Sequence, residues 1–351
     1  MRFGEKNHLV GLDIGSRTIK AAEIQETKKG LSLKKFGTID IESGAIEEGI
    51  IKDPEEVADS IKQLFKSFNF KEQNVAISIG GYSVIVKKIN VPNMPEKQLQ
   101  ETIHFEAEQY IPFDISDVNL DFQIIGENEN DSKQMNVLLV AAKKEIVTDY
   151  INLIQMAGLN PCIIDVDAFA LQNIFGVKND LKNENVALID IGASKTSLNI
   201  LKDNASVFMR DVSLGCGQIN QKISSLIGCS FMEAEQIKHG GQTDLLPEES
   251  LMEIISSVVN DWCIEIKRAL DFFYSTYTDD QIKKIILSGG GANIQQFRRL
   301  LEQETSAEVT TINPFESFHV DDDRFDSSYL KQIAPQAAIC MGLAIRKVND
   351  K

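Results

Sequence analysis

One motif occurs twice in this chain and limits the folds open to it. VGLDIGSRTIKAAEI at residues 10–24 returns in altered form as VALIDIGASKTSLNI at residues 186–200. In both copies an apolar run ends in Asp-Ile-Gly, and a second apolar run starts a few residues later. Asp13 and Asp190 therefore lie at the ends of strands that should be buried, where a charge is costly unless it has a partner. The repetition predicts a chain made of two similar units.

Each copy begins a longer series of expected elements. In the first unit, apolar periodicity predicts strands at residues 8–14, 18–24, 31–39 and 74–79, with a helix at 53–68 before the last strand. In the second unit, it predicts strands at residues 186–191, 196–201, 207–212 and 284–287, with a helix at 218–227. A length of 351 residues also exceeds what one core usually organises. We therefore expect a two-lobed α/β fold with a duplicated β-β-β-α-β core.

Both units are interrupted, which sets the expected domain boundaries. The first interruption reads as strand, helix, two strands, helix and strand, enough for a small α+β subdomain at residues 83–164. The second interruption, residues 228–282, reads as helical. We assign the first lobe to residues 1–82, 165–185 and 320–351, and the second lobe to residues 186–227 and 283–319.

The turns of the repeated motif have the composition of a phosphate site. Gly15 gives the backbone freedom to form a tight turn, and Ser16 and Thr18 add hydroxyl groups, so successive N–H groups can face an anion. Asp13 would repel a bare phosphate, and its presence is explained by a magnesium ion between the two. The second copy offers a facing set: Asp190, Gly192, Ala193 and Thr196. A third glycine-rich turn, ILSGGGAN, contributes Gly289, Gly290 and Gly291.

In this order and spacing, the three segments resemble the actin-like ATPase superfamily, which includes actin, hexokinase, the heat-shock ATPase chaperones and the division protein FtsA. The resemblance implies an actin-like fold with an inserted subdomain of the 1C type, and binding of ATP or ADP with Mg²⁺. It implies that Asp13 holds the metal and that Ser16, Arg17, Thr18 and Lys20 form the first phosphate loop. Gly215 and Gly217 of LGCG would line the nucleotide cleft, and Glu265 and Arg268 would contact the ribose and base.

The same resemblance leaves the rate of hydrolysis open. In members that hydrolyse ATP rapidly, a polar side chain near the segment equivalent to IIDVDAF orients the attacking water. Asp165 and Asp167 are equal candidates for that catalytic role in this sequence. We expect ATP binding with slow or no intrinsic hydrolysis.

Within the superfamily, further segments resemble the PilM family of type IV pilus assembly proteins. They are HFEAEQYIPFDISDVNLDFQII, AAKKEIVTDYINLIQMAGLNP, AEQIKHGG and PQAAICMGLAIRKV. The resemblance implies that the inserted subdomain and the first lobe take the N-terminal cytoplasmic tail of the membrane protein PilN, with Tyr110, Ile111, Pro112 and Phe113 as candidates for the groove. It also raises contact with the pilus motor ATPases, and assembly into a homo-oligomer or ring.

Composition excludes several other functions. A net charge of −16 argues against direct binding to nucleic acid or anionic lipid, although it would attract a basic partner segment. No apolar stretch approaches the roughly 20 residues of a membrane span. The five cysteines form no C-x-x-C pair. We expect a cytoplasmic protein that reaches the inner membrane through a protein partner.

Two functional alternatives stay open at this point. A small-molecule kinase of the same superfamily would use the same cleft, but it needs a carboxylate base in an acceptor pocket. A cytoskeletal protein like FtsA would share the inserted subdomain, but FtsA ends in an amphipathic membrane helix, whereas the closing MGLAIRKVNDK reads as a packed helix and a short charged tail.

Overall fold

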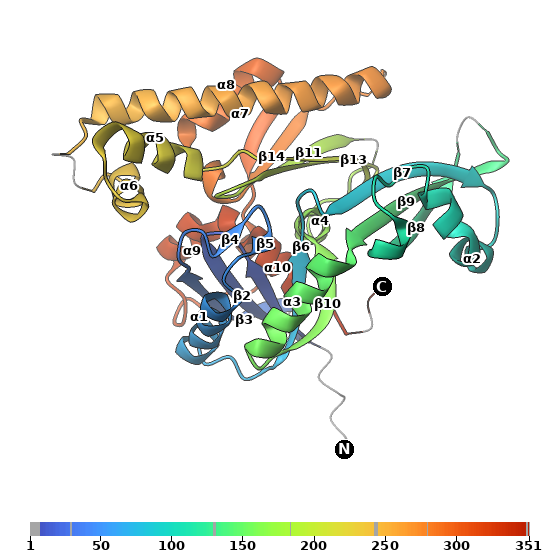
Figure 1. The fold of residues 1–351 in the computed structure, drawn as a ribbon, viewed down its shortest axis with the longest axis horizontal. Coiled ribbons are helices and arrows are strands. Elements are labelled where there is room, and N and C mark those ends of the chain that lie inside the picture. Colours follow the sequence, from blue (N-terminus) through green and yellow to red (C-terminus); the bar gives the residue numbers. More distant parts are fainter. Residues whose placement is uncertain are drawn as a thin grey trace.

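The computed structural model describes residues 8–28, 30–128, 131–182, 184–241, 245–278, 280–348 and 350. Figure 1 shows two lobes, one above the other, with a third, smaller unit projecting to the side. The lower, mostly blue part is the first lobe, the orange and yellow part is the second, and the cyan and green strands form the inserted unit. In the part of the chain that is described, no helix is both long and apolar enough to cross a membrane.

The first lobe is built on a five-stranded mixed sheet in the order β10-β6-β1-β2-β3. Its strands are β1 (Val10–Ile14), β2 (Thr18–Thr27), β3 (Gly30–Asp40), β6 (Asn74–Ile79) and β10 (Asn160–Val166). Helices α1 (Pro54–Ser67) and α3 (Lys144–Met156) cover one face and bury a core against it. Asp53 caps α1, because its Oδ1 accepts the Glu56 N–H at 3.0 Å. A short ribbon of β4 (Ile46–Glu47) and β5 (Ile50–Ile51) precedes α1.

The second lobe repeats this plan with the sheet order β13-β12-β11-β14-β15. Its strands are β11 (Asn185–Ile191), β12 (Thr196–Lys202), β13 (Ala205–Val212), β14 (Lys284–Ser288) and β15 (Glu308–Thr311). Its helices are α5 (Gly217–Ile227), α6 (Phe231–Lys238), α7 (Glu248–Thr276) and α8 (Gln295–Thr305). Trp262 and Phe273 of α7 and Phe297 of α8 are fully buried in the core that these helices share with the sheet. The expected duplication is therefore present in the structure.

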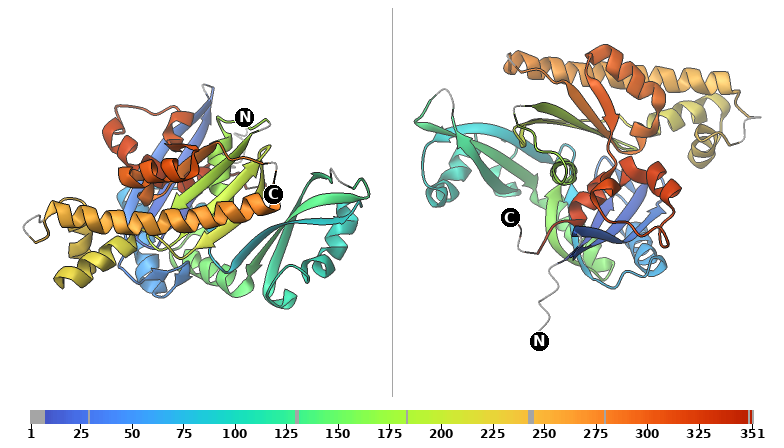
Figure 2. Two further views of the ribbon diagram at one scale, coloured as in Figure 1. Left: turned by 90° about the horizontal axis from the view of Figure 1, so that it is seen from above. Right: turned by 180° about the vertical axis from the view of Figure 1, so that it is seen from behind.

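Two central helices separate the lobes. These are α4 (Asp167–Gly176) and α10 (Ala338–Ala344), which pack on each other and, with α9 (Ser327–Ile333), contribute to a core that takes residues from both sheets. Gly342 allows their close approach, since a Cβ at that position would overlap the Ala170 carbonyl oxygen. The views of Figure 2 also place the red C-terminal helices between the two sheets. The molecule is thus layered, with these central helices between the two sheets.

The unit that packs separately is smaller than the expected inserted subdomain, residues 83–164. It has the sheet order β7-β9-β8, from β7 (Val84–Pro92), β8 (Val118–Glu127) and β9 (Gln134–Lys143), with α2 (Glu96–Ala107) on one face and its own apolar core. By contrast, β10 pairs with β6, and α3 packs on α1 in the first lobe. The insert therefore comprises residues 84–143, and the order of elements along the chain did not reveal where its packing ends.

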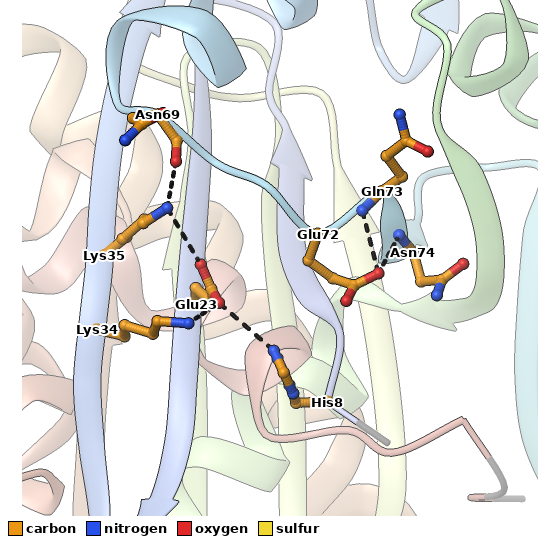
Figure 3. Close-up of polar contacts among 8 residues, drawn as sticks. All are labelled: His8, Glu23, Lys34, Lys35, Asn69, Glu72, Gln73 and Asn74. Carbon is orange, nitrogen blue, oxygen red and sulfur yellow. Dashed lines mark hydrogen bonds and ion pairs between the residues drawn. The ribbon is translucent and has the colours of Figure 1, made fainter. Parts of the chain in front are cut away.

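A buried carboxylate fixes the far end of the first sheet (Figure 3). Glu23 on β2 forms ion pairs with His8 at 3.4 Å, Lys34 at 2.6 Å and Lys35 at 3.6 Å, and Lys35 also donates to the carbonyl oxygen of Asn69. Burial alone would raise the pKa of Glu23, but Lys34 and Lys35 hold it below its usual value. The cluster ties β2 and β3 to the start of the chain and to the loop after α1, so its charges have structural partners.

Candidate functional site

Both repeated motifs fold into hairpins whose turns meet across the lobes. In each turn the glycine N–H donates to the carbonyl three residues later, from Gly15 to Thr18 at 3.2 Å and from Gly192 to Lys195 at 2.9 Å. The hydroxyl oxygens of Ser16 and Ser194 lie 3.0 Å apart. The first lobe and the second lobe thus touch through the two turns, as expected for opposed copies of one motif.

A cleft of about 1680 Å³ lies between the lobes around these turns. It is larger than the roughly 300–1,000 Å³ of most small-molecule sites, which suits an extended ligand. The expected ligand residues that line it are Asp13, Gly15, Ser16, Arg17, Thr18, Lys20, Asp167, Asp190, Gly192, Ala193, Gly215, Gly217, Gly289 and Gly290. Most of the sequence-derived set is therefore brought together in one place.

The glycines of the LGCG turn are required by close packing. A Cβ on Gly215 or Gly217 would meet the backbone of Ala193, because the turn donates hydrogen bonds from Cys216 and Gly217 to the second hairpin. Gly289 has a φ of +80°, which favours glycine, and a Cβ there would overlap the backbone of Ile191. These glycines place the α5 N-terminus and the end of β14 directly beside the hairpin turn.

Thr196 and Gly291 lie just outside the cleft and have packing roles. The Thr196 hydroxyl donates to the Leu214 carbonyl at 2.8 Å, which fastens the LGCG turn to β12. Gly291 is buried, and a Cβ there would overlap the side chain of Ile191 and crowd Trp262. Both residues shape the site without facing it.

The structure does not bring Glu265 and Arg268 to the cleft. They pair with each other on the outer face of α7, where the Arg268 side chain is 66% exposed. The pair has the expected i, i+3 spacing, but helix spacing cannot tell which face of α7 is turned to the cleft. Glu235 and Lys238 have the same spacing, form an ion pair at 2.7 Å and do line the cleft.

The structure also places the two candidate catalytic aspartates in different surroundings. Asp167 lines the cleft, whereas Asp165 points away from it and pairs with Arg346 at 3.0 Å. Asp167 accepts the Ser78 hydroxyl at 2.6 Å and pairs with Lys195 at 2.5 Å. Only Asp167 is therefore placed to meet a ligand, and it already has two partners.

Several cleft residues were missed by sequence reasoning. They are Ser78, Ser194, Lys195, Asn220, Ser224, Phe231, Glu235, Lys238, Met252, Ile255, Asn293 and Arg299. Lys195 lies within the second motif, so its position in DIGASK was a usable signal. Ser194 also lies in that motif, Asn293 closes the ILSGGGAN segment and Ser78 lies on β6, whereas the others come from helices whose orientation only the packing decides. Asn220 Oδ1 is buried and has no hydrogen-bond partner among the described residues, as expected of an atom that awaits a ligand.

The cleft concentrates buried charge. Asp13 and Lys20 are opposite each other on β1 and β2 and form an ion pair at 3.0 Å. Burial raises the pKa of Asp13 despite the opposing effect of Lys20, and Asp167 raises it further. Burial likewise raises the pKa of Asp190 to about 6; a hydrogen bond from Ser288 opposes this, and the charges of Asp13 and Asp167 add to it. The carboxylates repel one another in the ligand-free cleft.

This donor set fits a magnesium ion only when the ligand shares in its coordination. Among the described residues, no group of three or more His, Cys, Asp or Glu side chains forms a metal site. Mg²⁺ usually takes one or two carboxylates, several waters and phosphate oxygens. Asp13 and Asp190 supply carboxylates of that number, and a divalent cation would relieve their mutual repulsion.

The expected partner-groove residues lie at a corner of the insert. The helix α2 ends at Ala107, shortly before Pro112, which disfavours helix at the residue before it. Ile111 is buried and Pro112 is exposed. The Tyr110 ring lies 5.1 Å from Lys87 Nζ, and the Phe113 ring lies 4.5 Å from Lys143 Nζ. The corner therefore presents two half-buried aromatic rings, each beside a lysine.

Comparison with known proteins gives two results of broad coverage. The family model described as type IV pilus assembly protein PilM matches residues 11–348. A solved structure, the PilM-PilN type IV pilus biogenesis complex, is similar with a TM-score of 0.87 and 27% identity, over 99% of this chain and 100% of that one.

More distant similarity extends to other members of the fold. The ethanolamine utilization protein EutJ from Carboxydothermus hydrogenoformans matches with a TM-score of 0.57 and 13% identity, over 97% of this chain and 90% of that one. The cell division protein FtsA of Bacillus subtilis (strain 168) is 25% identical over 252 residues, which cover 65% of this chain and 57% of that relative. The two-lobed α/β fold of the actin-like ATPase superfamily, expected from the repeated motif, is confirmed.

Proposed function

The chain belongs to the PilM family of type IV pilus assembly proteins, and from that membership we propose that it is an ATP-binding scaffold whose insert holds the cytoplasmic tail of PilN. It acts on the cytoplasmic side of the inner membrane, which it reaches through that partner, and links PilN and PilO to the pilus motor. The observation that carries the nucleotide part is the meeting of the two hairpin turns at Ser16 and Ser194 inside one large cleft.

The nucleotide assignment rests on the chemistry of the cleft. The turns offer backbone N–H groups and hydroxyls to phosphates, and Lys20 and Lys195 add positive charge. Magnesium, held between Asp13 and the phosphates, would neutralise charge and orient the phosphate chain. The apolar side chains of Phe231, Met252 and Ile255 also line the cleft and offer a surface for a base.

In this proposal, another pair of residues makes the ribose contacts expected of Glu265 and Arg268. Glu235 and Lys238 line the cleft from α6, beside the unpartnered Oδ1 of Asn220. A carboxylate, an ammonium group and an amide oxygen are suitable partners for the hydroxyls of a ribose. Their place on α6, on the same helix as Phe231 and in contact with Asn220, suits the binding of a ribose.

Slow hydrolysis is consistent with the state of both catalytic candidates. Asp165 is held by Arg346 outside the cleft, and within the cleft Asp167 accepts the Ser78 hydroxyl, a hydrogen bond that does not depend on Lys195. A carboxylate that orients water needs a free oxygen lone pair in the right direction. We therefore propose that the protein binds ATP for long periods and uses it as a structural ligand or switch.

The PilN assignment rests on family membership and on the corner of the insert. Tyr110 and Phe113 present aromatic surface, as peptide-binding grooves commonly do. The net charge of −16 favours a partner segment that carries basic residues. The similar solved structure is a complex of PilM with PilN, so a protein of this fold and family takes that partner.

The test is calorimetric titration of the protein with a synthetic peptide that copies the PilN tail, with and without Mg-ATP. We expect binding that changes with nucleotide, because a switch requires a coupling free energy between cleft and groove. Phe113→Ala should weaken peptide binding by about tenfold or more, whereas Phe105→Ala, which alters a 71% exposed ring on α2, should not. Asp13→Ala should abolish Mg-ATP binding and leave the protein folded but less stable, because the buried Lys20 loses its partner.

Each outcome bears on a separate part of the proposal. Peptide binding that is indifferent to nucleotide would leave ATP as a structural cofactor. An unchanged affinity of Asp13→Ala for Mg-ATP would remove the nucleotide assignment. Absence of peptide binding in every condition would remove PilN as the partner of this chain.

A further inference from the structure

Lys195 forms an ion pair that joins the two lobes. None of the roles expected of the phosphate loops accounts for this ion pair. Lys195 lies in the turn between β11 and β12, and its side chain is 19% exposed. Its Nζ lies 2.5 Å from Oδ2 of Asp167, the first residue of α4, while the other carboxylate oxygen accepts the Ser78 hydroxyl at 2.6 Å. The ion pair therefore joins the second hairpin to the first lobe inside the cleft.

Lys195 and Asp167 neutralise each other, so neither charge needs a further partner until a second anion binds. Burial alone would lower the pKa of Lys195, but Asp167, and then Asp211, raise it above its usual value. Lys195 in turn lowers the pKa of Asp167 against the effect of burial. Removal of one member of a buried pair is costly because it leaves an uncompensated charge. Lys195 can leave Asp167 only for a ligand that is itself strongly anionic.

The position of Lys195 along the cleft indicates which part of a ligand it meets. The residues 215–217 pack on Gly192 and Ala193 and lead into α5, whose Asn220 lines the part of the cleft that the proposed function assigns to the nucleoside. Lys195, at the other end of the same turn, reaches toward Asp167 and Gly80 of the first lobe. A phosphate chain that starts from the nucleoside side therefore arrives at Lys195 last.

We propose that Lys195 is the residue that distinguishes a nucleoside triphosphate from a diphosphate, by exchanging Asp167 for the terminal phosphoryl group. This rests on the proposed binding of nucleotide in the cleft. A diphosphate is one phosphoryl group shorter and leaves the Lys195–Asp167 pair in place. A triphosphate offers Lys195 a charge-assisted contact that replaces the lost one, and Asp167 keeps the hydrogen bond from Ser78.

The exchange of partners by Lys195 would also affect the insert. Gly80 lies against the ion pair so closely that a Cβ there would overlap both Lys195 Nζ and Asp167 Oδ2. Residues 80–83 connect β6 to β7, the first strand of the insert. Movement of Lys195 away from Asp167 therefore changes the packing of the segment from which the insert starts.

The test compares affinities for ATP and ADP, each with magnesium, in the wild type, Lys195→Gln and Lys195→Arg by calorimetry. We expect Lys195→Gln to lose about tenfold or more in affinity for ATP and less than about threefold for ADP, because one charge-assisted contact is removed from one ligand only. Lys195→Arg should retain the preference for ATP. An unchanged ratio of the two affinities in Lys195→Gln would overturn the proposal.

Asp167→Asn gives a second test that does not touch the lysine. Removing the competing carboxylate should raise the affinity for ATP and leave that for ADP nearly unchanged, which is the opposite sign from Lys195→Gln. A purely structural ion pair would instead lower both affinities together in both variants. If the wild type bound neither nucleotide, the proposed function would fall, and the role of Lys195 with it.

Discussion

At the scale of single residues, the cleft holds charges that the ligand-free protein tolerates at a cost. Asp13, Asp167 and Asp190 act on one another, and the two lysines nearby are paired with the first two of these carboxylates. Asp190 has no lysine of its own among the described residues and is instead hydrogen-bonded by Ser288. Of these three carboxyl groups, Asp190 is therefore the one whose protonation should change the stability of the protein most clearly.

We predict that Asp190 makes the ligand-free protein less stable as the pH rises. The carboxyl group has its ordinary pKa of 3.8 in the unfolded chain but a pKa of about 6 in the folded protein, so between these values the folded state binds more protons and stability falls with rising pH. Asp190→Asn should therefore gain stability relative to the wild type by about 2 kcal/mol between pH 4.5 and pH 7.5.

Urea unfolding at several pH values, without nucleotide or magnesium, measures this effect. Asp59→Asn on α1 is a suitable control, because the Asp59 side chain is 74% exposed. Its stability should follow that of the wild type across the range. Parallel curves for Asp190→Asn and the wild type would contradict the assigned burial cost.

At the scale of elements, the central layer depends on close contact between α4 and α10. We predict that Gly342→Ala destabilises the protein by about 1–3 kcal/mol, since its Cβ would overlap the Ala170 carbonyl oxygen and force the helices apart. Gly176→Ala, in α4, is the matched control, because a Cβ there has no atom within 4 Å. It should be neutral or stabilising by up to about 1 kcal/mol.

Denaturant unfolding of the two variants is the direct comparison. Since both carry the same substitution in the same helical layer, a difference in their free energies of unfolding reports the contact and not the residue type. Equal stability of the two variants would mean that α10 shifts without penalty.

The elements themselves were largely predictable, whereas their packing was not. The two β-β-β-α-β units follow from apolar periodicity, and the Asp53 cap of α1 follows from local sequence. The helix α4 went unrecognised as an element, because its six apolar residues form no clear stripe and its segment was considered only for Asp165 and Asp167. Likewise, the pairing of β10 with β6 depends on contacts made across 80 residues or more of chain.

The same division applies to the candidate site. Residues in turns, such as Gly15 and Gly192, were found because their backbone geometry restricts the residue type. Lys238 and Asn220 were missed, because their helices carry no local signal for the cleft. Glu265 and Arg268 show the converse, since a spacing that is right for a pair on one helix face does not say where that face points.

At the scale of the whole molecule, the insert should be removable as a unit. Lys143 donates its backbone N–H to the Ser83 carbonyl at 3.0 Å, so the two ends of the insert are adjacent. We predict that replacing residues 84–143 by a short glycine-serine linker leaves a folded protein that binds Mg-ATP but not the PilN tail. Removing residues 83–164 should instead unfold it, since α3 and β10 belong to the first lobe.

Thermal unfolding followed by circular dichroism, together with nucleotide titration, separates the two deletions. A cooperative transition is expected for the 84–143 replacement alone. If that protein melted without cooperativity while the larger deletion folded, the boundary at residue 143 would be in error.

The root of the insert is also held by the lobe to which it is not covalently joined. The Gly81 N–H donates to Asp211 on β13 at 2.6 Å, and the Ser213 hydroxyl donates to Tyr82 at 3.3 Å. A bound membrane protein that pulled on the insert would therefore load two anchors. The first is the covalent chain to the first lobe, and the second is this pair of hydrogen bonds to the second lobe. Tension that broke the second anchor would leave the shared core, the Ser16–Ser194 contact and the Lys195–Asp167 pair to hold the lobes, so a load on the insert would be passed directly to the contacts that line the cleft.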